Sequence, residues 1–351
     1  MRTAILYSPK FLEHVPGTKH PERPARLRVI LRALERSRLL SSGRCRLVEP
    51  VGATVGDVLL VHDEEYVGFV ERRCRQGGII DLEGTAVSPG SFDAAIHAVR
   101  ASITAADLIL RGEFRNAFVL ARPPGHHAGP DYSCGFCVFN NVAAAAAHLT
   151  ARRGVKRVLI VDFDAHHGNG TQDIFYGRSD VLYASLHQYP HVFPGAGFSW
   201  EVGEGDGVGY NVNIPLPPMT GDEVYLEAVD RIIAPIARQY KPQFILASVG
   251  FDVHHRDPVG RLSLTAWGQL EAFRRVLSLA SLLCSGRFVA VLEGGYNLKF
   301  LGAMASADIA AMAGLHPRVW DTKPYTPRRV EAMGWRALRE VKRIQSAYWD
   351  L

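Results

Sequence analysis

Residues 158–171 read Val-Leu-Ile-Val-Asp-Phe-Asp-Ala-His-His-Gly-Asn-Gly-Thr, and they carry the clearest structural signal in the chain. Its first four residues are apolar and mostly β-branched, which predicts a strand buried on both faces of a parallel sheet. Because side chains alternate along a strand, we expect Asp162, Asp164 and His166 to project to one side at its carboxyl end, with Phe163 and Ala165 on the other. Open α/β sheets place their binding sites at that end.

These three polar side chains need a partner if they are buried. An isolated buried ion costs several kcal/mol, and a divalent cation is the simplest partner for two carboxylates and an imidazole. The alternative is a strand that ends in a solvated polar loop.

The composition describes an ordinary globular protein. The chain has 351 residues, of which 47% are hydrophobic and 21% are charged, so it can bury a large core and is not expected to be disordered. Five scattered cysteines make a disulfide framework improbable. No apolar run reaches the roughly 18 residues that cross a bilayer, and residues 3–7 predict a first strand instead of a signal segment. We therefore expect a cytoplasmic protein.

The net charge of +5 would suit an acidic partner, but the arginines are dispersed and form no basic tract with interleaved aromatic residues. Solvated helix faces explain this charge more simply, so the sequence argues against nucleic-acid binding.

Apolar runs and helical periodicities alternate along the chain, which predicts one α/β domain over residues 1–351 with a mostly parallel sheet and helices on both faces. Strands are predicted at residues 3–7, 116–121, 158–161, 181–186, 210–216, 244–249 and 288–292. Helices are predicted at 25–39, as a pair within 57–74, and at 92–110, 141–151, 223–240 and 267–284, with a loop at 81–91. The tail, 321–351, reads as a loop and a helix carrying Trp335 and Trp349; it packs on the domain or on a second subunit.

Two adjacent histidines, His126 and His127, lie in the loop 122–130 that follows the strand 116–121. Prolines and glycines stiffen this loop and shape its turns, which a His-rich surface loop would not require. Adjacent residues rarely bind one metal together, so the pair is better suited to proton transfer.

Four strand ends thus offer polar residues to one rim of the sheet. Asp164, His166 and Asp252 form a two-carboxylate, one-imidazole set that suits a catalytic zinc ion with one open position. The histidine pair is placed to move protons, and Tyr296, on a Gly-Gly turn, is placed to donate to a developing oxyanion. Amide hydrolysis is the reaction class that uses all of these parts.

The blocks that carry these residues resemble the signature of the histone deacetylase superfamily of zinc-dependent deacylases. They follow in the family's order between His20-Pro21-Glu22 and Tyr296, and they comprise residues 122–128, 134–141, 162–172, 250–252 with Asp257-Pro258, and 293–297. The resemblance implies an arginase-like α/β fold and a zinc ion held by Asp164, His166 and Asp252. It further makes His126, His127 and Tyr296 the catalytic residues.

The resemblance also assigns supporting residues. It implies that Asp162 orients His126, and that the acyl-lysine tunnel is formed by Phe136, Phe193, Gly135 and Gly295. Family members hold a monovalent cation, usually potassium, behind the zinc; the matching positions are Asp162, Asp164, His166, Ser185 and Leu186. A second potassium site would match Phe175, Arg178, Val181 and Tyr210.

Two departures from the family pattern are informative. Asn169 stands where one branch has an aspartate that orients the second histidine, so the sequence is closer to the class II and bacterial branch, which includes the acetylpolyamine amidohydrolases. We therefore expect His127 to lack a charged partner and to be neutral, as a general base requires. Val259 replaces the glutamate of a polyamine-selective branch, which weakens the case for a polyamine substrate without excluding it.

The main expectation is hydrolysis of an acyl amide of the acetyl-lysine type, and an acetylpolyamine or another small molecule is the alternative substrate. A di-manganese ureohydrolase would need an acidic residue where Gly168 stands. A catalytically silent module that binds acylated partners would be expected to lose a ligand, a histidine or the tyrosine, and none is missing. The sequence leaves the acyl chain, the substrate and association into homo-oligomers open.

Overall fold

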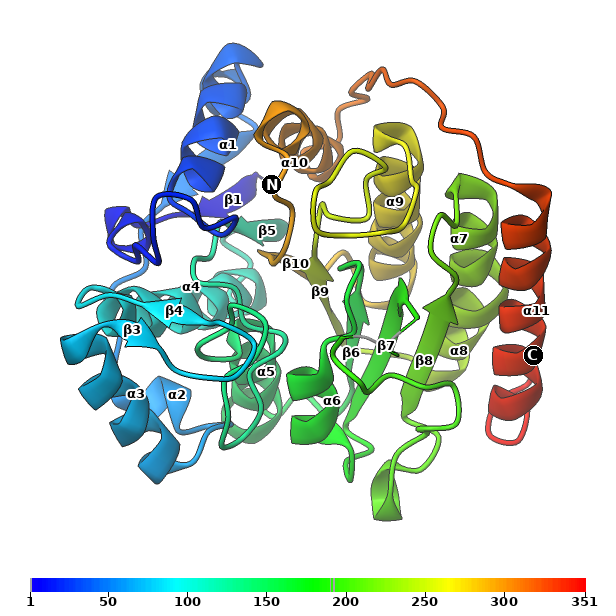
Figure 1. The fold of residues 1–351 in the computed structure, drawn as a ribbon, viewed down its shortest axis with the longest axis horizontal. Coiled ribbons are helices and arrows are strands. Elements are labelled where there is room, and N and C mark those ends of the chain that lie inside the picture. Colours follow the sequence, from blue (N-terminus) through cyan, green and yellow to red (C-terminus); the bar gives the residue numbers. More distant parts are fainter. Residues whose placement is uncertain (1, 190, 192) are drawn as a thin grey trace.

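The computed structural model describes residues 2–189, 191 and 193–351, and its centre is an eight-stranded sheet (Figure 1). All neighbouring strands of this sheet are parallel, which confirms the predicted architecture. In spatial order the strands are β2 (Cys45–Val48), β1 (Thr3–Leu6), β5 (Asn116–Val119), β10 (Phe288–Leu292), β9 (Phe244–Val249), β6 (Val158–Asp162), β7 (Val181–Gln188) and β8 (Asn211–Leu216).

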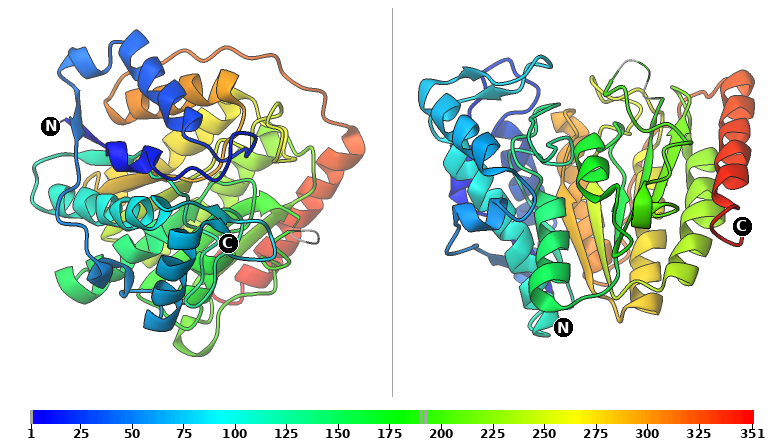
Figure 2. Two further views of the ribbon diagram at one scale, coloured as in Figure 1. Left: turned by 60° about the vertical axis from the view of Figure 1, so that its left-hand side comes forward. Right: turned by 90° about the horizontal axis from the view of Figure 1, so that it is seen from below.

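Helices cover both faces of the sheet (Figure 2). This follows from the parallel strands, because the connection from one strand to the next must run back along a face of the sheet, usually as a helix. One face carries α4 (Ser91–Leu110), α5 (Asn141–Ala147) and α6 (Asn169–Phe175). The opposite face carries α1 (Ala25–Arg36), α10 (Leu298–Met312), α9 (Ala266–Leu283), α7 (Asp222–Ala228), α8 (Ala234–Tyr240) and α11 (Arg328–Gln345). Within the described ranges, no helix combines the length and the apolar character that crossing a bilayer requires.

A smaller layer packs outside α4. It contains α2 (Val55–Val58), α3 (Glu64–Gln76) and an antiparallel hairpin of β3 (Gly78–Ile79) and β4 (Ala86–Val87). Buried Val58, Val67 and Ile96 belong to a second apolar cluster beneath this layer. The hairpin corrects part of the loop expected at residues 81–91, because two-residue strands are too short to show an alternating pattern.

Several helices differ from the predicted ranges, and each difference has a local cause. The helix expected at residues 223–240 contains a π-helical turn, Val229–Ile233, just before Pro235, which has no N–H for the helical ladder. A second π-helical turn, His148–Arg152, extends α5. Helix α10 was not predicted, because it is apolar almost all round and shows no amphipathic stripe.

The C-terminal tail packs against the sheet of its own chain. Helix α11 covers the β8 edge of the sheet and buries Leu338 and Val341. Beyond the end of this helix, the indole Nε1 of Trp349 donates a hydrogen bond to the carbonyl of Gly209 at 2.9 Å. Trp335 lies on the helix as expected, whereas Trp349 follows it.

Candidate metal centre and active site

Four neighbouring strands in the middle of the sheet, β5, β10, β9 and β6, direct their carboxyl ends to the same edge. The segments that follow them carry the histidine pair, the Tyr296 turn, Asp252 and the Asp-x-Asp-x-His run. Residues separated by more than 150 positions in sequence therefore meet, as expected from strand ends in a parallel sheet.

Asp164, His166 and Asp252, called here the ligand triad, offer three ligand atoms within 4.8 Å of one another. The Nδ1 atom of His166 lies 3.2 Å from Asp164 Oδ1 and 3.0 Å from Asp252 Oδ2. Backbone amides of Gly294 and Ala165 donate to the remaining carboxylate oxygens at 2.8 and 3.0 Å. These hydrogen bonds hold the side chains of the ligand triad in place.

The ligand triad fits a catalytic zinc ion. All three side chains are buried, and burial together with the charge of Asp164 raises the pKa of Asp252 to about 7. Two adjacent carboxylates are ionised together at neutral pH only if a cation balances them. Two carboxylate oxygens and one imidazole nitrogen form a zinc-type donor set, and Asp164 and His166 face a cavity that leaves one side open. Zinc itself remains a prediction.

The chain reaches this geometry with a strand that is shorter than the alternating run. Strand β6 ends at Asp162. Beyond it, two hydrogen bonds from backbone amides to side-chain carboxylates hold the segment that carries Asp164 and His166. The amide of Asp164 donates to Asp162 Oδ1 at 3.1 Å, and that of His166 donates to Asp164 Oδ1 at 2.9 Å. Phe163 and Ala165 point into the core, as predicted.

His126 has an acidic partner. Its Nδ1 lies 3.0 Å from Asp162 Oδ2, which also accepts a hydrogen bond from the hydroxyl of Tyr183 at 2.9 Å. Burial opposes protonation of His126, but the carboxylates of Asp162 and Asp164 outweigh it and raise the pKa of His126 to about 10. The neighbouring carboxylates thus favour the protonated form of the first histidine.

His127 has an amide partner instead, which confirms the prediction made from Asn169. Its Nδ1 lies 2.7 Å from Asn169 Oδ1. Burial, and then the neighbouring positive charge of His126, hold the pKa of His127 well below its usual value. The two adjacent imidazoles thus differ in protonation, because one faces a carboxylate and the other faces an amide.

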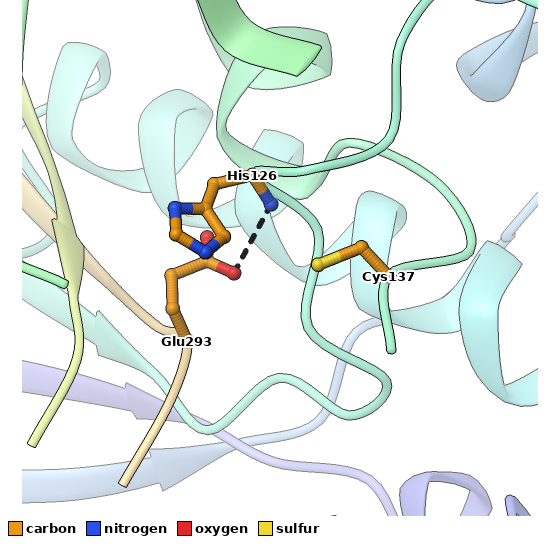
Figure 3. A group of neighbouring side chains, drawn as sticks. All are labelled: His126, Cys137 and Glu293. Carbon is orange, nitrogen blue, oxygen red and sulfur yellow. Dashed lines mark hydrogen bonds between the residues drawn. The ribbon is translucent and has the colours of Figure 1, made fainter. Parts of the chain in front are cut away.

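Glu293 fixes the loop that carries the histidines, a role that the sequence did not reveal. Its Oε2 accepts hydrogen bonds from the backbone amides of Gly125 at 2.7 Å and His126 at 3.2 Å (Figure 3). Cys137 lies opposite, and ligand atoms of the three side chains are within 4.8 Å. Burial raises the pKa of the Cys137 thiol well above its usual value, so this group is a poor metal site compared with the ligand triad.

A cavity of about 400 Å³ leads to the ligand triad. Phe136 lies on one side, where its ring meets that of Tyr296 at 6.0 Å between centroids; Phe193 lies against His127 at 5.0 Å. Gly135 lines the cavity as expected, and a Cβ there would lie 2.4 Å from a ring carbon of His127. Gly295 was also expected in the lining, but the structure places Gly294 there.

Gly295 packs beneath the cavity wall, where a Cβ would lie 2.7 Å from Cβ of Phe251. Its neighbour Tyr296 lines the cavity, and burial raises the pKa of this phenol well above 10, so the hydroxyl keeps its proton. Asp257 Oδ2 accepts hydrogen bonds from the amides of Tyr296 and Asn297 at 2.6 and 3.0 Å and fixes the turn.

A buried ion cluster supports the same turn from below, and sequence reasoning missed it. Arg26 donates to the carbonyl of Gly295 at 2.7 Å, and its guanidinium lies 5.0 Å from the ring centroid of Tyr296. Glu22 pairs with Arg26 at 3.3 Å and with Arg122 Nη2 at 2.7 Å. The His20-Pro21-Glu22 motif drew attention to Glu22, but Arg122, which pairs with Glu22, lies a hundred residues away in sequence.

The residues matched to potassium sites lie in two places. Asp162 pairs with Ser185 across β6 and β7, next to Leu186. The second set, Phe175, Arg178, Val181 and Tyr210, surrounds the start of β7: the amide of Arg178 donates to the carbonyl of Phe175, and that of Tyr183 donates to the carbonyl of Tyr210. Both potassium sites stay predictions.

Comparisons with known proteins agree with this geometry. A family model described as the histone deacetylase domain matches residues 20–312. A probable deacetylase of Archaeoglobus fulgidus is 43% identical, over 99% of this chain and 99% of its own length. A histone deacetylase-like amidohydrolase of Pseudomonas aeruginosa is 37% identical, over 86% of this chain and 79% of its own length. The crystal structure of the HDA15 HD domain matches with a TM-score of 0.89 at 35% identity, and the match covers 99% of this chain and 95% of that one.

These likenesses extend over nearly the whole chain, and the matched family model spans all four strand ends that form the site. The predicted deacetylase-like fold is therefore confirmed, and the chain belongs to the histone deacetylase family.

Proposed function

We propose that the protein is a zinc-dependent deacylase that hydrolyses the amide between a short acyl group and an amine of the acyl-lysine type. One observation carries this proposal: His166 Nδ1 lies between two buried carboxylates at the end of a cavity that is also lined by Tyr296 and both histidines. A binding module would need neither two histidines in different protonation states nor a neutral phenol beside a metal-type donor set.

A bound zinc ion would be held by the ligand triad and would supply Lewis-acid chemistry, which polarises a carbonyl and eases deprotonation of water. Neutral His127 is suited to accept the proton of the attacking water and to return it to the leaving amine. Charged His126, held by Asp162, stabilises the negative charge that develops beside it. The Tyr296 hydroxyl is suited to donate a hydrogen bond to the oxyanion.

The competing functions find less support. A Cβ at Gly168 would lie 2.4 Å from Asp162 Oδ2, so the acidic side chain that a two-metal ureohydrolase requires does not fit there. A silent acyl-binding module fits poorly with a complete set of ligands, histidines and tyrosine. An acetylpolyamine presents the same amide as acyl-lysine and remains the alternative substrate.

The test is product release from acetyl-lysine peptides and acetylpolyamines by zinc-loaded protein. Tyr296→Phe should lower kcat by roughly 10²-fold or more, because it removes one donor to the oxyanion. Tyr325→Phe is the matched control, since Tyr325 is 78% exposed and does not line the cavity. Equal rates for wild type and Tyr296→Phe, or two equivalents of transition metal per chain, would overturn the proposal.

A further inference from the structure

Two oppositely charged side chains, Glu83 and Arg261, stand at the exposed rim of the active-site cavity. Among the described residues that line this cavity, Asp164 is the one other side chain with a formal charge besides the histidines, and it lies at the metal end. In the part of the chain that the structure describes, neither Glu83 nor Arg261 takes part in an ion pair. The rim thus offers one free negative and one free positive charge.

Glu83 belongs to the side of the cavity that carries Phe136. It lies in the turn between β3 and β4, and two hydrogen bonds join this turn to the Phe136 segment. The hydroxyl of Ser133 donates to Asp81 Oδ2 at 3.0 Å, and the amide of Phe136 donates to Thr85 Oγ1 at 2.9 Å.

Arg261 comes from a different segment of the chain. It lies in the loop that follows Asp252, and its amide donates to Gln188 Oε1 at 2.8 Å, at the carboxyl end of β7. Its carbonyl accepts a hydrogen bond from the amide of Met219 at 2.7 Å. The two charges therefore line the same cavity from segments that are far apart in the sequence, the β3–β4 turn and the loop after Asp252.

A substrate that satisfies both charges carries an ammonium and a carboxylate at the end remote from its acyl amide. Resting on the proposed function, we propose that this rim selects free ω-N-acyl α-amino acids of the Nε-acyl-lysine type. Their α-ammonium faces Glu83 and their α-carboxylate faces Arg261. An acyl-lysine inside a peptide has neither charge, and an acylpolyamine has no carboxylate for Arg261.

The first experiment compares four substrates on the zinc-loaded full chain: free Nε-acetyl-lysine, its Nα-acetyl derivative, its α-amide and the doubly blocked compound. Each blocked group should lower kcat/KM by about two- to fivefold, the size expected for exposed ion pairs. The loss should appear in KM, because these charges lie away from the reacting atoms, and it should shrink as salt is added.

The second experiment assigns each charge to its partner. Glu83→Gln should remove the penalty for blocking the ammonium and keep the penalty for blocking the carboxylate; Arg261→Gln should do the reverse. Glu65→Gln and Arg339→Gln make the same charge changes at exposed positions outside the cavity lining and should leave both ratios unaltered.

Equal kcat/KM for all four substrates, a higher value for the doubly blocked compound or for an acetylpolyamine, or unchanged ratios in both rim variants would overturn this inference while leaving the deacylase proposal intact. Release of product from none of these substrates would overturn the proposed function, and this inference with it.

Discussion

Replacing Glu22 by glutamine isolates the buried ion cluster beneath the tyrosine turn. Glu22, Arg26 and Arg122 are fully buried. His14 Nε2 lies 3.2 Å from Glu22 Oε2, and burial holds the pKa of His14 below its usual value. Glu22 is therefore the single anion between two guanidinium groups. Glu22→Gln keeps the shape of the side chain but leaves both cations without a counter-charge.

The expected loss of stability follows from this burial. Removing one partner from a buried ion pair costs about 3–5 kcal/mol, because the remaining charge stays desolvated. With a urea m-value of about 3 kcal/mol/M, the unfolding midpoint should fall by roughly 1–1.7 M. The loss should also reach activity, since Arg26 supports the turn that carries Tyr296.

Urea unfolding followed by tryptophan fluorescence measures this shift. Glu340→Gln is the matched control: it makes the same replacement in an exposed ion pair with Arg343 and should have little effect. Burial opposes ionisation of Glu22, but Arg122 holds the pKa of this carboxyl well below its usual value. Its stabilising effect is thus present at neutral pH and is lost as the pH falls through the folded-state pKa. A midpoint for Glu22→Gln equal to that of Glu340→Gln would mean that Glu22 does not stabilise the two buried guanidinium groups.

Three further predictions concern protonation and the metal. Asn169→Asp places a carboxylate against His127, so the pKa of His127 should rise and the acidic limb of the kcat/KM profile should move to higher pH. Asp308 is buried with one oxygen unpaired, and burial raises its pKa well above the usual value. The contribution of Asp308 to stability should therefore fall as pH rises above about 4, and Asp308→Asn should gain in stability relative to wild type over that range in urea unfolding at pH 5 and 8. Removing the metal with a chelator should lower the thermal midpoint, by an amount equivalent to about 2.7 kcal/mol at a metal concentration of 100 times Kd.

Each of these has a contradicting result. An unshifted acidic limb in Asn169→Asp would mean that another group sets it. Equal urea midpoints for Asp308→Asn and wild type at both pH values would mean that the aspartic acid is adequately solvated. A thermal midpoint unaffected by chelation, with metal loss verified by elemental analysis, would mean that the ligand triad is stable without a cation.

The sequence predicted the parallel sheet and the meeting of the ligand triad, because both depend on local signals. A β-branched run identifies a buried strand, and an acidic residue or histidine just after it must lie at the sheet's carboxyl edge. The contact between Asn169 and His127 was expected from the resemblance to the histone deacetylase family, because Asn169 stands at the position where one branch has an aspartate.

The supporting contacts were not predictable, because they join distant residues without a periodic pattern. Nothing local indicates that Glu22 pairs with Arg122 or that Glu293 accepts the amides of the histidine loop. Helix α10 was missed because its apolar surface has no polar face to mark its period. The choice between Gly294 and Gly295 depended on the direction of a turn, which two successive glycines do not specify.

The turn at Phe136 links the tunnel wall to the outer hairpin. Phe136 adopts a left-handed backbone with φ of 70°, a conformation that costs an ordinary residue about 1 kcal/mol and that the bond to Thr85 helps to hold. The hairpin is outside the eight-stranded sheet, so the loop at its tip can change in length without disturbing the core of that sheet. Changing this one peripheral loop would therefore move the Phe136 ring and the Glu83 charge together. Evolution or protein engineering could thus alter the range of substrates that the cavity accepts by changes at a single loop.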